Sequence, residues 1–232
     1  MTTVSTSAPT TGAGAGLQAV LLDMDGTLVD TEDFWWQAEA SLFAELGHEL
    51  DEADRAHVVG GPMSRVIDYL RARTGVSLTP PELTVLINQR FVDLLAGGVP
   101  LMPGAERLLN TLAAHGVPAA LVSASHRHII DIVLRSLGAH HFAFTVAGDE
   151  VARTKPFPDP YLAAVARFGA EPGRCVVVED APTGVLAAEA AGCPVIAVPS
   201  VAAIEPGPGR TVLGSLEQVD LELLRAVVAS RV

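Results

Sequence analysis

The stretch LQAVLLDMDGTLVD, residues 17–30, joins an apolar run of strand length to two closely spaced acids. Residues 17–23 are almost continuously apolar up to Asp23, and Asp25 follows after one residue. An apolar run without polar alternation is typical of a strand that is buried on both faces, as in a parallel sheet. We therefore expect a central β-strand with Asp23 and Asp25 at its carboxyl end.

Working outward, strand-like and helix-like segments alternate in the second half of the chain. Short apolar runs occur at residues 118–123, 142–147, 175–179 and 194–198. Apolar residues at three- and four-residue spacing predict helices at residues 103–115, 126–137, 159–168 and 183–191. Because alternating strands and helices are joined by right-handed crossovers, this order predicts an α/β fold with a doubly wound parallel sheet.

Residues 31–98 break the alternation. They contain four helical patterns and no expected strand, at residues 31–46, 52–59, 62–73 and 80–96. This insert predicts an α-helical cap domain, and it leaves the first strand at the end where open α/β sheets bind ligands. The expected division is a core of residues 17–30 and 99–232, a cap of residues 31–98, and a disordered tail of residues 1–16 rich in Thr, Ala, Gly and Ser.

The charge of the chain limits its partners. The formal net charge is -12, which disfavours nucleic acid and anionic membranes, since both require a positive field. The first residues lack a basic start and an apolar run, so no signal peptide or membrane anchor is predicted and a cytoplasmic location is expected. Lys155 is the only lysine in an arginine-rich sequence. It stands there by chance or because a compact ammonium fits between carboxylates where a planar guanidinium does not.

Polar residues follow three of the expected strands at their carboxyl ends. They are Asp23 and Asp25, then Ser123, then Glu179 and Asp180. Carboxylates that lie close together raise one another's pKa unless a cation binds between them, and Mg²⁺ prefers oxygen ligands. Glu179 and Asp180 can alternatively cap the helix that follows them. Capping does not explain why acids occur at more than one strand end.

Four segments resemble the motifs of the haloacid dehalogenase-like hydrolase superfamily. Residues 23–29 (DMDGTLV) resemble its first motif, Ser123 its second, residues 155–160 (KPFPDP) its third, and residues 179–184 (EDAPTG) its fourth. A helical insert between the first two motifs is similar to the branch that contains β-phosphoglucomutase and many sugar-phosphate phosphatases. The resemblance implies a phosphatase acting on a small phosphorylated metabolite, such as a sugar or polyol phosphate.

Carried over to the matching positions, the resemblance also implies a mechanism through an aspartyl-phosphate. Asp23 is expected to attack phosphorus, and Asp25 to act as general acid and then as general base. Ser123 and the backbone amides around Asp25 and Gly26 are expected to hold the phosphoryl oxygens. Lys155 is expected to offset negative charge on the nucleophile and in the transition state.

The same resemblance implies Mg²⁺ between the first and fourth motifs. The expected ligands are the Asp23 carboxylate, the Asp25 carbonyl and Asp180. Glu179 is expected to bind it directly or through water. A dication suits an acidic protein that handles an anionic substrate, because it offsets the local negative field.

Four further residues are candidates for substrate contact. Ser125 and His126 follow the second motif and can touch the substrate. Arg65 can reach a phosphate or hydroxyl group from a cap helix, or it is simply exposed. Trp35 lies four residues after Thr31, so both face the same side of the first cap helix. The tryptophan ring can stack on a sugar, or it packs the cap against the core.

Three other functions compete with the phosphatase. A dehalogenase attacks carbon and needs no second aspartate, so Asp25 disfavours it. A phosphomutase uses every core residue, but the β-phosphoglucomutases similar to this chain carry histidine where Trp35 stands and lysine where His126 stands. A non-catalytic binding module is disfavoured because Asp23, Asp25 and Lys155 are intact. A monomer or small homo-oligomer is expected.

Overall fold

The computed structural model describes residues 16–58 and 63–230. Within them, one parallel sheet has the strand order β3-β2-β1-β4-β5-β6. The strands are β1 (Ala19–Leu22), β2 (Ala119–Val122), β3 (Phe144–Val146), β4 (Cys175–Glu179), β5 (Val195–Ala197) and β6 (Arg210–Val212). The predicted doubly wound α/β class is therefore confirmed.

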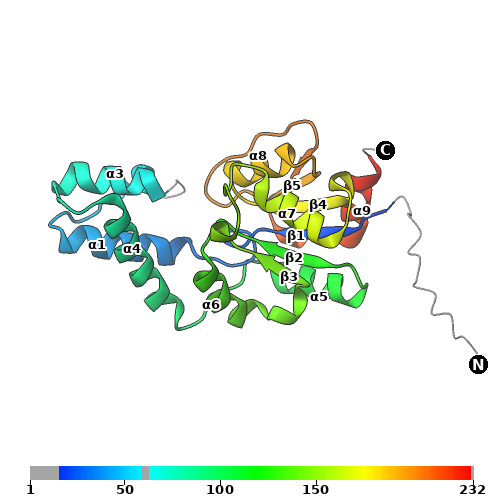
Figure 1. The fold of residues 1–232 in the computed structure, drawn as a ribbon, viewed down its shortest axis with the longest axis horizontal. Coiled ribbons are helices and arrows are strands. Elements are labelled where there is room, and N and C mark those ends of the chain that lie inside the picture. Colours follow the sequence, from blue (N-terminus) through cyan, green and yellow to red (C-terminus); the bar gives the residue numbers. More distant parts are fainter. Residues whose placement is uncertain (1–15, 59–62, 231–232) are drawn as a thin grey trace, which may run out of the picture.

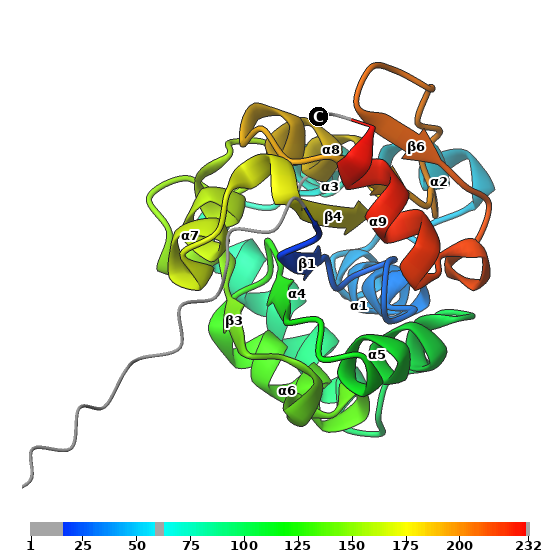
Figure 2. The ribbon, with the colours of Figure 1, turned by 90° about the vertical axis from the view of Figure 1, so that its right-hand side faces the viewer.

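Helices cover both faces of this sheet (Figure 2). They are α5 (Ala105–Ala114), α6 (Arg127–Leu137), α7 (Asp159–Phe168), α8 (Pro182–Ala190) and α9 (Leu221–Ala229). Successive side chains of β1 enter opposite cores: Ala19 and Leu21 pack with α7 and α8, and Val20 and Leu22 with α5, α6 and α9. Because all four are fully buried, β1 is apolar on both faces, as the uninterrupted run in the sequence indicated.

Four helices of the described residues lie between β1 and α5 in the chain. They are α1 (Glu32–Glu45), α2 (Glu52–Val58), α3 (Met63–Thr74) and α4 (Pro80–Leu95). Helix α1 packs on α4, and α3 packs on both α2 and α4. In Figure 1, α1, α3 and α4 lie beyond one end of the sheet, on the side where the chain leaves β1. We call these helices the α1–α4 group.

Every helix and strand expected from the sequence is present, with ends within two residues of the expected ones where both lie in the described residues. Strand β6 and helix α9 were not expected. The predicted tail, residues 1–16, lies outside the described residues except for Gly16, and so do Val59 and Pro62 of the expected cap helices.

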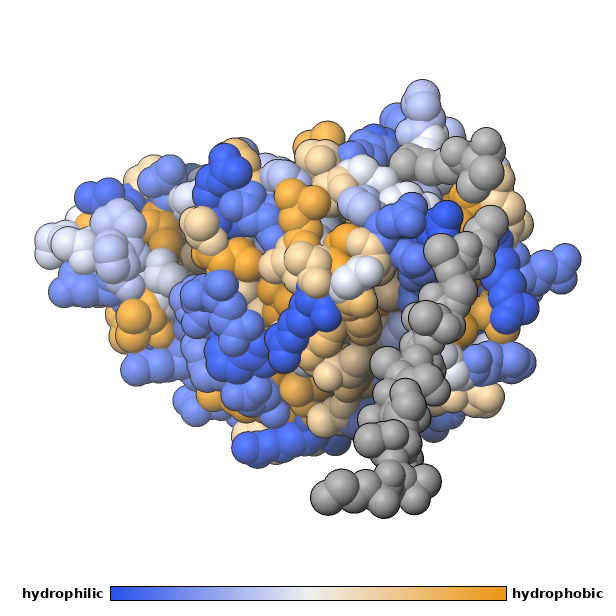
Figure 3. All heavy atoms as spheres, turned by 45° about the vertical axis from the view of Figure 1, so that its right-hand side comes forward, coloured by the Kyte–Doolittle hydropathy of each residue, from blue (hydrophilic) through white to orange (hydrophobic). Residues whose placement is uncertain are grey.

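Polar and apolar residues are mixed on the surface. Figure 3 shows one face on which hydrophilic residues are spread over the molecule with apolar side chains between them. Large exposed hydrophobic side chains of the described residues lie on separate elements: Val85, Phe157, Leu162, Leu186 and Val201. No helix in the described part of the chain combines the length and hydrophobicity needed to cross a bilayer.

Candidate active site

The strand order brings together the acids that follow the strands. Strand β1 lies between β2 and β4, and Leu22 at its end pairs with Leu121 and Val178, each one residue before the end of its strand. Asp23, Ser123 and Glu179 therefore stand side by side at the carboxyl edge of the sheet, with Asp180 directly after Glu179. All four are buried. A site of convergent polar groups thus lies where ligands of open α/β sheets bind.

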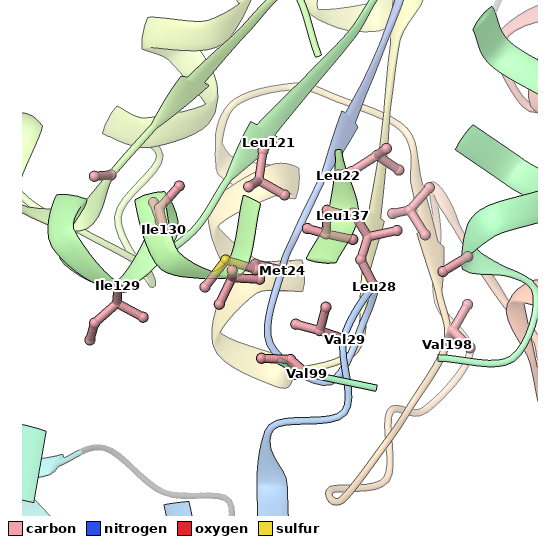
Figure 4. Close-up of a cluster of buried hydrophobic side chains, with 14 of the residues drawn as sticks. Leu22, Met24, Leu28, Val29, Val99, Leu121, Ile129, Ile130, Leu137 and Val198 are labelled. Atoms are coloured by element: carbon pink, nitrogen blue, oxygen red, sulfur yellow. The ribbon is translucent and has the colours of Figure 1, made fainter. Parts of the chain in front are cut away.

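Apolar side chains that pack in the core hold the turn after β1 in place. Met24, Leu28 and Val29 are fully buried and point into the core in Figure 4. The amides of Leu28 and Val29 donate to the Met24 carbonyl at 2.9 and 3.1 Å. Met24 points into the core, whereas the side chains of its neighbours Asp23 and Asp25 take part in the hydrogen bonds of the site. The alternation of acid and apolar residue in the first motif thus has a packing reason.

Two glycines allow the backbone to approach the acids closely at the carboxyl edge of the sheet. Gly26 has φ +77°, and a Cβ built there lies 2.2 Å from Asp180 Oδ2. A Cβ at Gly184 lies 1.6 Å from Glu179 Oε1. A side chain at either position displaces an acid of the site, so the glycines of the first and fourth motifs are required by close approach.

The two oxygens of Asp23 have different surroundings. Lys155 Nζ donates to Oδ1 at 2.6 Å. Oδ2 is buried and has no hydrogen-bond partner among the described residues. Burial and then the charge of Glu179 raise the pKa of Asp23 well above its usual value, although Lys155 opposes this. A buried carboxylate oxygen without a partner is unfavourable, so Asp23 Oδ2 is ready to bind a cation.

Lys155 holds three oxygens together. Its ammonium donates to Asp23 Oδ1, to Glu179 Oε1 at 2.7 Å and to the Val122 carbonyl at 2.9 Å. It also lies 5.0 Å from the ring centroid of Tyr161. Burial lowers the pKa of Lys155, but the charges of Asp23 and Glu179 outweigh burial, so the pKa is raised and the amine stays charged. The side chain is 4% exposed, which leaves little room for a larger cation.

Glu179 is bonded on both oxygens. Oε1 accepts from Lys155 and from the Tyr161 hydroxyl at 2.8 Å. Oε2 accepts from the amides of Asp180 and Ala181 at 3.0 and 3.1 Å. Both amides precede the first residue of α8, and that helix has no side-chain cap hydrogen bond at its N-cap, Ala181, so the capping interpretation of Glu179 and Asp180 was wrong. Through Oε1, Glu179 contacts Lys155 at the same time.

Asp180 completes an acidic cluster. Thr27 Oγ1 donates to its Oδ1 at 3.3 Å, and the Ser200 hydroxyl donates to its Oδ2. Burial and then the charge of Glu179 raise the pKa of Asp180 to about 7. Oxygens of Asp23, Glu179 and Asp180 lie within 4.8 Å of one another. Buried oxygens at this spacing, one of them unpartnered, fit a hard divalent cation.

Asp25 is bonded only to hydroxyl groups among the described residues. Thr31 Oγ1 donates to Oδ1 at 2.9 Å. Ser125 and Ser123 donate to Oδ2 at 2.9 and 3.3 Å. Burial raises the pKa of Asp25, while these hydrogen bonds lower it by less. Asp23 is therefore paired with a cation and Asp25 with neutral groups, which suits a nucleophile beside a proton carrier.

The structure does not bring the other sequence candidates into these hydrogen bonds. Trp35 stacks on Phe91 of α4, with ring centroids 3.6 Å apart, so its ring packs α1 against α4, both within residues 31–98. Arg65 is exposed on α3, and its charge acts on Glu39. His126 is exposed at the start of α6. Substrate contact by these residues stays a prediction.

Four residues of the hydrogen-bond network were not predicted as site residues: Thr27, Thr31, Tyr161 and Ser200. Ser200 follows β5, so the rule of strand carboxyl ends could have found it. Thr31 precedes α1 as a capping residue would, but its hydroxyl donates to Asp25 and caps no amide. Tyr161 follows the third motif on α7, and nothing in its spacing indicated that it would reach Glu179.

Two relatives of known name match this chain over most of its length. Protein CbbY, plasmid, of Cupriavidus necator is 34% identical over 200 residues, which cover 79% of this chain and 79% of that protein. (DL)-glycerol-3-phosphatase 1, mitochondrial, of Arabidopsis thaliana is 34% identical over 209 residues, which cover 84% of this chain and 69% of that protein.

A solved structure has the same architecture. A mutant of CbbY from Rhodobacter sphaeroides in complex with xylulose-(1,5)bisphosphate matches with a TM-score of 0.77 and 28% identity, over 90% of this chain and 99% of that chain. The family model for haloacid dehalogenase-like hydrolase matches residues 20–198. The resemblance inferred from the four motifs is therefore confirmed: this chain belongs to the haloacid dehalogenase-like hydrolase family.

Proposed function

We propose that this protein is a magnesium-dependent phosphatase that hydrolyses the phosphate monoester of a small sugar or polyol through an aspartyl-phosphate on Asp23. The observation that carries the proposal is the pair of carboxylates with unlike partners. Asp23 is bonded to an ammonium group and keeps one oxygen unpartnered among the described residues. Asp25 is bonded to hydroxyl groups. One acid is prepared for attack and the other for proton transfer.

In the first half-reaction Asp23 attacks phosphorus, and the bond between phosphorus and the ester oxygen breaks. Asp25 gives its proton to the leaving oxygen. Burial raises the pKa of Asp25, which favours the protonated form that a general acid requires. In the second half-reaction Asp25 takes a proton from water as the water attacks phosphorus, and Asp23 is released.

The remaining core residues bind the phosphoryl group or offset negative charge. Ser123 and the amides near Gly26 bind phosphoryl oxygens, and Lys155 offsets charge on Asp23. Mg²⁺ would be held by Asp23, the Asp25 carbonyl and Asp180, with Glu179 binding directly or through water. When bound, it supplies positive charge that offsets these carboxylates and the phosphoryl oxygens.

We also propose that residues 31–98 form a cap over the site, with residues 17–30 and 99–232 as the core. Support comes from Thr31, which links the start of α1 to Asp25. Trp35 and Arg65 of the cap, and Ser125 and His126 of the core, remain candidates for substrate contact. A cytoplasmic location and a monomer or small homo-oligomer also stay predictions.

A small sugar or polyol phosphate is favoured by the relatives. One is named as a glycerol-3-phosphatase, and a CbbY mutant was crystallised with a sugar bisphosphate. The test measures phosphate release from p-nitrophenyl phosphate and a panel of sugar and polyol phosphates, with Mg²⁺ and with EDTA. We expect release that requires Mg²⁺; no release from any compound would contradict the proposal.

A second assay separates hydrolase from mutase. The enzyme is incubated with β-glucose 1-phosphate and a trace of the 1,6-bisphosphate, and free phosphate is compared with glucose 6-phosphate. We expect free phosphate, because water is the final acceptor. Accumulation of glucose 6-phosphate with little free phosphate would restore the phosphomutase.

A further inference from the structure

The loop between β2 and α6, residues 123–126, carries two hydroxyl groups that are hydrogen-bonded to Asp25. Ser125 and Ser123 donate to Asp25 Oδ2 at 2.9 and 3.3 Å. The Ser125 amide in turn donates to Ser123 Oγ at 2.9 Å. Because the two serines are bonded to each other as well as to Asp25, the backbone conformation of this loop, which we call the β2 loop, sets the direction of both hydroxyl groups.

The loop that follows β3, residues 147–150, lies directly against the β2 loop, and we call it the β3 loop. The Gly148 amide donates to the Ser125 carbonyl at 2.9 Å. A Cβ built at Gly148 lies 2.1 Å from the Ala124 carbonyl oxygen, so the two backbones touch at this point. The place of the β2 loop therefore depends on the place of the β3 loop.

Arg127 joins the two loops. Its Nε and Nη2 donate to the two carboxylate oxygens of Glu150 at 2.8 and 2.6 Å, and its Nη1 donates to Thr145 Oγ1 at 2.6 Å. Its backbone amide donates to Asp149 Oδ1 at 2.9 Å. Glu150 also accepts from the Ala147 amide at 3.0 Å. Because a bidentate pair sets orientation as well as distance, these bonds fix the end of the β2 loop relative to the β3 loop.

Helix α6 alone does not explain an arginine at this position. Arg127 is the first residue of α6, where the helix dipole disfavours a cation. The pair is also partly open to solvent, with side-chain exposures of 31% for Arg127 and 43% for Glu150. A pair exposed to this degree contributes little to the free energy of unfolding. Its main effect should therefore be on the geometry of the two loops.

We propose that Arg127 is a positioning residue: through its pair with Glu150 it keeps the hydroxyl groups of the β2 loop directed at Asp25. The inference rests on the proposed function, because the orientation of Asp25 matters only if this group carries the proton to the leaving oxygen. When the β2 loop shifts, the hydrogen bond from Ser125 is lost and Asp25 Oδ2 is no longer held. Proton transfer then becomes less efficient.

The effect should depend on the leaving group. Phenol is a weaker acid than p-nitrophenol, so phenyl phosphate needs the proton of Asp25 more than p-nitrophenyl phosphate does. The test measures the ratio of kcat/KM for phenyl phosphate over p-nitrophenyl phosphate. A smaller amount of folded enzyme lowers both activities equally, so a merely structural role of Arg127 would not change this ratio.

We expect Arg127→Ala to lower the ratio by roughly fivefold, a part of the about 10²–10⁴-fold that general acid–base catalysis contributes. Arg127→Lys keeps the charge without the bidentate geometry, so its ratio should lie between those of Arg127→Ala and wild type. The matched control is Arg210→Ala. Arg210 donates to both carboxylate oxygens of Glu189 at 2.7 Å and joins β6 to α8, so its loss should leave the ratio unchanged.

A double-mutant cycle tests whether Arg127 acts through Ser125. Ser125→Ala should lower the ratio by itself. Adding Arg127→Ala to Ser125→Ala should then change the ratio by less than about twofold, because both residues act on one interaction. Fully additive effects would show that Arg127 acts elsewhere and would overturn the proposal.

The outcomes separate the two proposals. If wild type does not hydrolyse p-nitrophenyl phosphate, the proposed function itself fails. If wild type hydrolyses it but Arg127→Ala leaves the ratio unchanged, or Arg210→Ala lowers the ratio equally, the role of Arg127 is overturned and the phosphatase stands. Should Arg127→Ala not fold, the ratio in Glu150→Gln, which keeps the size of the side chain but breaks the bidentate pair, decides.

Discussion

The carboxyl edge of the sheet and the α1–α4 group place their polar side chains by different means. At the sheet edge, Asp23, Ser123 and Glu179 follow strands whose order and register put them side by side. In the α1–α4 group, Asp54 of α2 meets Tyr69 of α3 because the two helices pack together. Backbone geometry sets the first arrangement and side-chain packing sets the second. We expect changes at the edge to alter chemistry and changes in the group to alter stability.

Two buried aspartates show the difference most clearly. Asp23 and Asp54 are 6% and 1% exposed, yet their pKa values shift in opposite directions. Burial and the charge of Glu179 raise the pKa of Asp23. The hydrogen bond from Tyr69, and then that from the Asp51 amide, lower the pKa of Asp54 below its usual range. A carboxylate whose oxygens accept hydrogen bonds stabilises the fold, whereas one with an unpartnered oxygen can react or bind a cation.

The largest effect is expected for Asp23→Asn. An amide cannot act as the nucleophile, so turnover of p-nitrophenyl phosphate should fall by about 10⁴-fold or more. Thermal unfolding should show an intact fold, because a buried carboxyl group with a raised pKa is replaced by a neutral group of the same shape. The control, Asp93→Asn, removes an exposed acid from α4 and should retain full turnover. Activity of Asp23→Asn within tenfold of wild type would contradict the role of Asp23 as the nucleophile.

Lys155→Arg comes next. The ammonium contacts three oxygens at 2.6, 2.7 and 2.9 Å, and a planar guanidinium cannot occupy the same small space. We expect kcat to fall by roughly 10²-fold or more although the charge is kept. The control is Arg153→Lys, which changes an exposed neighbour that pairs with Asp159. Normal activity of Lys155→Arg would mean that the single lysine is there by chance.

A matched pair of tyrosines sharpens the comparison between the two regions. Tyr161→Phe and Tyr69→Phe each remove a hydroxyl group that donates to a buried acid, Glu179 in one case and Asp54 in the other. We expect Tyr161→Phe to lower kcat about tenfold, since a hydrogen bond to a charged group is lost beside the nucleophile, and to weaken Mg²⁺ binding measured by calorimetry. Tyr69→Phe should lower the thermal midpoint and leave kcat unchanged. If Tyr161→Phe and Tyr69→Phe lowered kcat equally, the expected difference between the sheet edge and the α1–α4 group would be contradicted.

The smallest effect concerns acid stability. Because the folded protein lowers the pKa of Asp54, the deprotonated form stabilises the fold above the ordinary aspartate pKa, and this stability is lost as pH falls below that value. Asp54→Asn should therefore be less stable at neutral pH and lose less stability between about pH 5 and pH 3. Asp68→Asn, an exposed change on α3, serves as control. The thermal midpoint against pH measures both; parallel curves would contradict the role of Asp54.

The first, second and fourth motifs could be predicted from the sequence because each lies at the end of a strand that is buried on both faces. The glycines and acids of the first and fourth motifs report directly on close approach at the sheet edge, as Gly26 and Gly184 show. Strand β6 escaped prediction because it is a three-residue edge strand of partly buried residues, two of them polar. Helix α9 did carry a signal, since Asp220 caps it by accepting from the Leu223 amide at 2.8 Å.

Side-chain packing between distant segments could not be predicted. Trp35 had two interpretations in the sequence, and only the position of Phe91 on α4 shows its ring stacked within the helices. The contact of Tyr161 with Glu179 likewise depends on how α7 packs beneath the sheet edge.

The covalent step on Asp23 can be observed directly in Asp25→Asn. p-Nitrophenyl phosphate has a leaving group that needs little protonation, so Asp23 should still be phosphorylated, while loss of the general base slows hydrolysis by roughly 10²–10⁴-fold. After acid quench, mass spectrometry should find one phosphoryl group on the peptide that contains Asp23, and none in the double variant that also carries Asp23→Asn. An unmodified Asp23 peptide under these conditions, or a phosphoryl group on another residue, would contradict the account.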